Sequence, residues 1–275
     1  MIGWWRLERE LARWARAGRR PRLWWRDDDA EAAGPALHRL LALAGRLRLP
    51  LLLAVIPGRA PAAELAGLAA CLAAHPQAFV AQHGVCHANH RRPGEPDAEH
   101  PSWQPAAAIA AAIAGARPRL AGMPRLLPVY VPPWNAAHPA LRQALAGLGL
   151  ALSAGGAAGP GGAPAELDPL RWRPQPRFRG AGACLGRMRR ALRQRRRAGE
   201  WDRPLGLLTH HLAHDAACWA FLEAALPRLA ADPRLDWIAP PALFPPLDHP
   251  GSDAYPSPPM AMAIPRDLSG QLAAR

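Results

Sequence analysis

Short apolar runs alternate with amphipathic segments along most of this 275-residue chain. The apolar runs predict buried strands at 22–26, 51–56, 79–82, 126–131 and 205–209. Apolar residues at helical spacing predict helices at 33–47, 62–74, 106–116, 137–148, 184–198 and 216–229. Strands that alternate with helices indicate parallel strands joined by right-handed crossovers, so the pattern predicts an α/β fold. About six or seven such units fit either a closed barrel or an open doubly wound sheet.

The two ends of the chain differ from this central pattern. Residues 1–20 are expected to form an amphipathic helix whose apolar positions are Trp4, Leu7, Leu11 and Trp14. This helix is expected to pack on the flank of the domain, and a helix lying on a membrane surface is the alternative. No change in composition divides residues 21–240, which we interpret as one barrel domain with a Gly, Ala and Pro loop at 154–164. Residues 241–275 are Pro-rich and aperiodic, which is typical of a tail.

The apolar runs and the cysteines of the chain indicate where in the cell the protein is expected. The longest apolar run, 49–57, is far shorter than the roughly 18–20 residues that a transmembrane helix needs. The first 20 residues carry Arg and Glu where a secretory signal would be apolar. Four scattered cysteines without a CxxC pair predict free thiols and argue against zinc held by four thiolates. We therefore expect a cytoplasmic protein with no transmembrane segment.

The net charge of +13 would ordinarily indicate a polyanionic partner. All 34 basic residues are Arg, however, and Ala, Gly and Pro are abundant beside them. These four residue types share GC-rich codons, so the basicity is typical of a GC-rich genome. No nucleic-acid partner is expected, although an Arg-rich helix at 187–197 keeps a polyanion-binding protein as an alternative.

Polar side chains cluster where the predicted strands end. Asp27, Asp28 and Asp29 follow the first strand, and His83 and His87 follow the third. The segment 132–135 (PPWN) and the segment 209–211 (THH) follow two later strands. Because the carboxyl ends of parallel strands lie on one rim, these residues can converge although they are far apart in sequence.

Two histidines at HxxxH spacing and a carboxylate can form a three-ligand zinc site with an open position for water. A run of three aspartates is costly to pack unless a cation neutralises it, which favours this interpretation. The simpler interpretations are a structural His pair and an aspartate that caps a helix. His210, His211, His214 and Asp215 could form a second metal site, but His210 fits better as a proton donor.

Four segments resemble motifs of the polysaccharide deacetylase (NodB homology) family, in the family's order. WWRDDDA resembles the first motif, QHGVCHANH the second, VYVPPWN the third and LGLLTHH the fifth. The resemblance covers about Arg22 to Asp215. It implies a distorted (β/α)7 barrel and metal-dependent hydrolysis of an N-acetyl or similar acyl group on a sugar substrate.

The resemblance also implies a role for individual residues. The metal ligands would be Asp29, His83 and His87, which suit one Zn²⁺ but would also accept Co²⁺, Ni²⁺ or Fe²⁺. Asp28 would be the base that activates the metal-bound water, and His210 would protonate the leaving amine. The pair Asp27/Asp28 stays open as the alternative to Asp28/Asp29. The residues expected to contact substrate are Trp134, whose peptide N–H would help to hold the oxyanion, Asn135 and His211.

The sequence departs from the family pattern at two places. The third motif usually begins with an Arg that orients the base, but Val131 stands there, and Asn135 or Arg26 could substitute for it. No clear fourth motif is present, and Asp168 and Trp172 are the nearest candidates. A catalytically inactive barrel that binds carbohydrate is therefore an alternative to an active deacetylase. The sequence predicts neither the particular sugar nor the oligomeric state.

Overall fold

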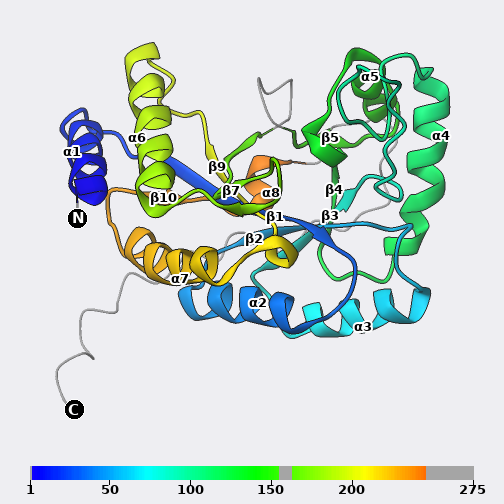
Figure 1. Ribbon diagram of the computed structural model, residues 1–275, viewed down its shortest axis with the longest axis horizontal. Coiled ribbons are helices and arrows are strands. Elements are labelled where there is room, and N and C mark those ends of the chain that lie inside the picture. The colour runs from blue at the N-terminus through cyan, green and yellow to red at the C-terminus, as the bar shows by residue number, and fades with distance from the viewer. Residues whose placement is uncertain (1, 155–162, 246–275) are drawn as a thin grey trace.

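A curled parallel sheet forms the centre of the computed structural model, which describes residues 2–154 and 163–245 (Figure 1). Its strand order is β5-β4-β3-β2-β1-β9-β6, and β10 also pairs with β1. The strands are β1 (Arg22–Ala30), β2 (Leu51–Val55), β3 (Ala78–His83), β4 (Leu126–Val131), β5 (Ala151–Leu152), β6 (Ala165–Leu167), β9 (Leu205–Thr209) and β10 (Asp236–Trp237). A separate two-stranded antiparallel ribbon consists of β7 (Leu170–Arg171) and β8 (Arg177–Phe178).

Helices surround this sheet. They are α1 (Ile2–Arg16), α2 (Pro35–Leu47), α3 (Ala62–Ala73), α4 (Ala106–Ala116), α5 (Pro139–Gly147), α6 (Ala181–Ala198), α7 (Ala216–Ala230) and the short α8 (Pro240–Leu243). Figure 1 shows α2, α3 and α7 along one side of the sheet, α1 beside α6 at one end, and α4 and α5 at the other. The predicted α/β architecture of parallel strands and crossover helices is confirmed.

The curled sheet is an open half-barrel rather than a closed one, because β5 and β6 at its two edges do not pair within the described residues. The segments beside these edges nevertheless meet, since the hydroxyl of Ser153 donates a hydrogen bond of 3.0 Å to the carbonyl of Ala163. This geometry agrees with the distorted barrel that the sequence resemblance implies.

The side chains on the two faces of β1 pack in different parts of the core, because successive strand residues point to opposite sides. Trp25 packs in the outer cluster between the sheet and helices α2, α3 and α7. Trp24 faces inward, where Phe244 meets it edge-on at 5.7 Å between ring centroids. This alternation continues to the end of β1 and decides where its polar residues point.

One boundary differs from the sequence prediction in a way that matters for the site. The aspartates Asp27, Asp28 and Asp29 do not follow the first strand but form its last part, since β1 runs to Ala30. Apolar character ends at Trp25, yet backbone pairing with β2 and β9 continues past it.

The predicted opening helix is present as α1, which packs along α6. The indole N–H of Trp14 donates to the carbonyl of Leu192, and the buried carboxylate of Glu10 pairs with Arg13 and Arg196. The domain limits at residues 20 and 240 stay predictions. Residues 155–162 of the predicted loop and 246–275 of the predicted tail lie outside the described residues.

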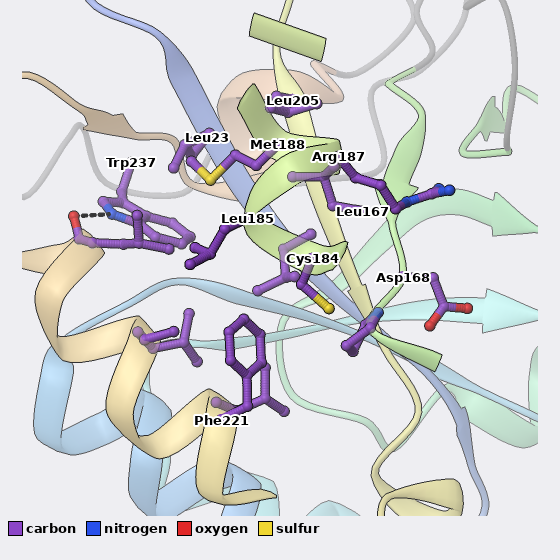
Figure 2. A pocket seen from close by; sticks show the side chains of 16 residues that line it. Leu23, Leu167, Asp168, Cys184, Leu185, Arg187, Met188, Leu205, Phe221 and Trp237 are labelled. Atoms are coloured by element: carbon purple, nitrogen blue, oxygen red, sulfur yellow. Dashed lines mark hydrogen bonds between the residues drawn. The ribbon is translucent and has the colours of Figure 1, made fainter. Parts of the chain in front are cut away.

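An apolar cavity of about 50 Å³ lies between the outer face of the sheet and helices α6 and α7 (Figure 2). It is lined mostly by aliphatic and aromatic side chains such as Leu23, Met188 and Phe221, with Asp168 at one end. None of the predicted metal ligands lines it. The four cysteines are free, as predicted, and none of the described helices is long and apolar enough to cross a membrane.

Candidate metal centre and active site

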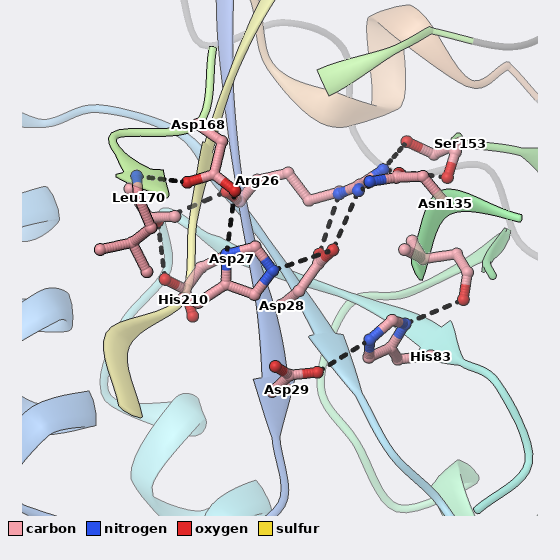
Figure 3. Close-up of polar contacts among 12 residues, drawn as sticks. Arg26, Asp27, Asp28, Asp29, His83, Asn135, Ser153, Asp168, Leu170 and His210 are labelled. Carbon is pink, nitrogen blue, oxygen red and sulfur yellow. Dashed lines mark hydrogen bonds and ion pairs between the residues drawn. The ribbon is translucent and has the colours of Figure 1, made fainter. Parts of the chain in front are cut away.

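The three consecutive aspartates of β1 have three different environments (Figure 3). Asp27 and Asp28 point to opposite faces of the strand, as neighbouring strand residues do. The pairing with β2 then shifts register between Asp27 and Ala30, and Asp29 adopts a left-handed backbone with φ of 70°. This irregularity turns the Asp29 carboxylate toward His83. Each of the three carboxylates therefore has its own protein partner, and Asp29 is the one that lies against the two histidines.

Asp29, His83 and His87 converge on one point. Asp29 Oδ1 lies 3.0 Å from His83 Nε2 and 3.3 Å from His87 Nε2. One ligand atom from each residue lies within 4.8 Å of the other two, so a single divalent ion fits among them. His83 Nδ1 donates to the carbonyl of Val131 at 2.9 Å, which orients the ring with Nε2 toward the ion. Within the described residues this is the one cluster of at least three potential ligands, and the alternative set around His214 does not form one.

Strained backbone conformations gather at this site. Among the described residues, six that are not glycine have a positive φ angle, and Asp29, His87, Trp134 and Asn135 are four of them. Such conformations are costly and persist where the surrounding structure imposes them, which is common at functional sites. All four are residues for which the sequence predicts metal or substrate contact.

Burial and charge act in opposite directions on the two central ligands. Burial raises the pKa of Asp29, but hydrogen bonds from His83 and His87 outweigh it, so the pKa lies well below its ordinary value. Burial lowers the pKa of His83, yet the hydrogen bond to Asp29 and the charges of Asp28 and Asp29 raise it overall. Asp29 is thus held as a carboxylate, and its charge together with that of Asp28 acts on His83 and favours a cation beside it.

Asp28 is held by Arg26, two residues earlier on the same face of β1. Arg26 Nε lies 2.9 Å from Asp28 Oδ1, and the Arg26 Nη2 donates to Asp28 Oδ2 at 2.9 Å. The same guanidinium donates to Asn135 Oδ1 and to both the hydroxyl and the carbonyl of Ser153. Both residues that could substitute for the third-motif Arg therefore help to orient Asp28: Arg26 contacts it directly, and Asn135 contacts Arg26.

His210 lies on the other side of Asp28. Its Nε2 is 4.0 Å from Asp28 Oδ2, and its Nδ1 is 3.9 Å from Asp168 Oδ2. The indole N–H of Trp172 donates to Asp168 at 2.7 Å, and the Trp172 ring meets the His210 ring at 4.5 Å between centroids. Asp168 and Trp172, the nearest sequence candidates for a fourth motif, thus both lie beside His210.

His211 and Asp27 form a buried pair beneath this site. The His211 Nδ1 donates to Asp27 Oδ1 at 2.5 Å, and the Thr209 hydroxyl donates to Asp27 Oδ2 at 2.6 Å. Burial alone would raise the pKa of Asp27 and lower that of His211, but their mutual attraction reverses both directions. The predicted substrate contact of His211 remains a prediction, and its side chain, only 1% exposed, offers a ligand little surface.

Two tryptophans border the site from different elements. Trp134, after β4, is 40% exposed, and its ring lies 4.5 Å from that of His87 between centroids. Trp172, next to β7, is also 40% exposed, so it is not a core residue. Aromatic faces of this kind suit the apolar faces of sugar rings.

Sequence reasoning missed two residues that support the site. Ser153 follows β5 and holds Arg26, and Glu99 accepts hydrogen bonds from the loop that carries His87. Ser153 stands at a strand end, where the rule of convergent strand ends could have drawn attention to it. Glu99 lies in a polar loop with no distinguishing pattern.

No protein-family model matches the sequence, and no curated protein matches it. Solved structures do match the fold. The catalytic domain of a peptidoglycan N-acetylglucosamine deacetylase from Eubacterium rectale superposes with a TM-score of 0.54 at 10% identity, covering 84% of this chain and 93% of the other. A family 4 acetyl xylan esterase from Clostridium thermocellum, solved with a cobalt ion, gives 0.50 at 15% identity over 81% and 90% of the two chains.

A mutant of a CE4 family pseudoenzyme with restored enzymatic activity matches with a TM-score of 0.53 at 12% identity, covering 82% of this chain and 67% of the other. These identities are low, so the likeness concerns the fold. The chain has the curled (β/α)7 fold of the CE4 polysaccharide deacetylases, the family that its sequence motifs resemble.

Proposed function

We propose that this protein is a metal-dependent hydrolase that removes an acetyl or similar acyl group from an N-acylated sugar. The observation that carries the proposal is the convergence of Asp29, His83 and His87 on one point. A carboxylate, Asp28, and an imidazole, His210, lie beside that point from the same edge of the sheet. This set supplies a metal site, a base and an acid within one small region.

A divalent ion held by Asp29, His83 and His87 would polarise the acyl carbonyl and lower the pKa of water, and Zn²⁺ suits two imidazoles and a carboxylate. Asp28 is the proposed base that takes the proton of the attacking water. Arg26 restricts the rotation of the Asp28 carboxylate through two contacts, so one orientation is held before substrate arrives.

The leaving amine must gain a proton before the C–N bond breaks, which requires an acid near the base. We assign this role to His210 rather than His211, because His211 Nδ1 is already committed to buried Asp27. Asp168 Oδ2 faces His210 Nδ1 at 3.9 Å and would orient the ring. The peptide N–H of Trp134 remains the proposed oxyanion donor.

The substrate class rests on the exposed rings of Trp134 and Trp172, which flank His87 and His210. The related folds act, by their descriptions, on a peptidoglycan amino sugar and on acetylated xylan. We therefore propose an N-acetylated amino sugar or its short oligomer. A cytoplasmic location remains part of the proposal and would favour a small precursor over an assembled polymer.

The test is acetate release from N-acetylglucosamine oligomers by protein reconstituted with Zn²⁺, with Asp28→Asn as the matched inactive variant. We expect turnover that a chelator abolishes and added Zn²⁺ restores. Binding of metal and sugar without acetate release would favour the inactive carbohydrate-binding barrel. Salt-sensitive binding of a polyanion without metal dependence would favour the Arg-rich α6 as the functional surface.

A further inference from the structure

Glu99 lies in the loop between β3 and α4 and is only 2% exposed. Its carboxylate accepts three backbone hydrogen bonds, from Val85 N at 2.8 Å, Cys86 N at 2.7 Å and Ala88 N at 3.3 Å. These three N–H groups lie on both sides of His87. The Glu99 carboxylate thus satisfies the backbone N–H donors of an irregular loop, a role that neighbouring strands have within a sheet.

The loop also fits closely around this carboxylate. Gly84 has φ of 61°, and a Cβ atom there would lie 2.2 Å from Glu99 Oε2 and 2.7 Å from Pro133 Cγ. The backbone carbonyl of Glu99 accepts a hydrogen bond of 2.7 Å from His90 Nδ1. Glu99 therefore ties its own end of this loop to the beginning of the loop, through its side chain and through its main-chain carbonyl.

No ion pair to Glu99 occurs among the residues that the structure describes. A buried carboxylate without a cationic partner is costly, and here the three N–H groups offset that cost. Between these hydrogen bonds, His87 has a left-handed conformation, with φ of 58°, that a non-glycine residue seldom adopts.

We propose that Glu99 is a positioning residue for the metal site: its carboxylate fixes the backbone on both sides of His87 and so sets the affinity of the site for a divalent ion. This inference rests on the proposed metal-dependent function. It assigns to Glu99 no contact with metal or substrate, and its effect passes through His87.

The experiment compares Glu99→Gln with Glu10→Gln. Glu10 is an equally buried carboxylate, 1% exposed, that pairs with Arg13 and Arg196 between α1 and α6, away from the site. The Zn²⁺ Kd is measured by competition with a chromophoric chelator, and the Tm of each metal-free variant is measured by circular dichroism. We expect Glu99→Gln to weaken Zn²⁺ binding by about 10- to 100-fold, the usual effect of losing a residue that orients a metal ligand.

Glu10→Gln should lower the Tm but leave the Zn²⁺ Kd unchanged. With Co²⁺ in place of Zn²⁺, the visible absorption of the ion should change for Glu99→Gln and not for Glu10→Gln, because only the first alters ligand geometry. If Glu99→Gln does not fold, Glu99→Asp replaces it; this variant keeps the charge but reaches less far, and it should also weaken Zn²⁺ binding.

The two proposals fail in different ways. Tight Zn²⁺ binding by the wild type with an unchanged Kd and Co²⁺ spectrum in the Glu99 variant would overturn the role of Glu99 alone. Equal weakening of Zn²⁺ binding by the Glu10 variant would also overturn it, since general destabilisation would then explain the effect. A wild type that binds neither ion would overturn the proposed function itself.

Discussion

Arg26 and Asp28 lie two residues apart on β1 and are joined by a hydrogen bond from Nη2 to Oδ2 and an ion-pair contact between Nε and Oδ1, each of 2.9 Å. Residues two apart on a strand share a face, so the pair follows from strand geometry alone. The family's third motif usually begins with an Arg, and here Val131 occupies that place. Arg26 reaches the proposed base from the base's own strand and is braced by Asn135 and Ser153.

Arg26→Lys tests this replacement. A lysine ammonium is a single point charge and cannot make both contacts, so Asp28 should lose its fixed orientation. We expect kcat/KM for the deacetylation to fall by about 100-fold while the Zn²⁺ Kd stays unchanged. Steady-state kinetics and chelator competition measure the two quantities. Wild-type kinetics in this variant would refute an orienting role for Arg26.

Asp168→Asn tests the pairing with His210. The variant removes the negative charge that faces His210 Nδ1, and its single amide oxygen can replace only one of the two carboxylate oxygens, which accept from the Leu170 N–H and the Trp172 indole N–H. We expect kcat to fall by about 10- to 100-fold, because the carboxylate that faces the proposed acid is lost. The control is Asp202→Asn, which changes an exposed aspartate outside the proposed site and should retain full activity. An unchanged kcat in the Asp168 variant would contradict this assignment.

His214 makes the stability of the fold depend on pH. Its Nε2 accepts a hydrogen bond from the backbone N–H of His210, and burial, together with the charges of His210 and His211, lowers its pKa from 6.5 to about 4. The folded protein therefore keeps His214 neutral where the unfolded chain already binds a proton. Stability that is present above pH 6.5 is lost as the pH falls toward 4.

His214→Gln keeps an acceptor for the His210 N–H but cannot titrate. The free energy of unfolding, measured by urea titration with a chelator present, should fall by up to about 3 kcal/mol more in the wild type than in this variant between these two pH values. Parallel curves for the two proteins would show that His214 is not held neutral in the fold.

The sequence predicted the long elements well, since their periodicity extends over several residues. The limits of α4, β4 and β9 agree with the predicted 106–116, 126–131 and 205–209. Strands of two or three residues, such as β5, β6 and β10, were missed because so short a run carries no periodicity. These strands owe their conformation to pairing with the long strands beside them.

Convergence of polar side chains at strand ends predicted which residues meet, but not how they divide their roles. Asp27, Asp28 and Asp29 are indistinguishable in sequence, and their roles depend on alternation along β1 and on a register shift relative to β2. The contacts of Glu99 and Ser153 span loops whose course no local pattern encodes. Tertiary geometry, rather than residue type, decides these parts of the site.

Zinc content is the most direct test of the central claim that Asp29, His83 and His87 hold a divalent ion. The measurement compares wild type, His83→Ala and His75→Ala by elemental analysis after reconstitution and desalting; His75, at the amino end of β3, is the control. We predict about one equivalent of Zn²⁺ in the wild type and in His75→Ala and almost none in His83→Ala. Equal zinc in all three proteins, or none in the wild type, would contradict the account.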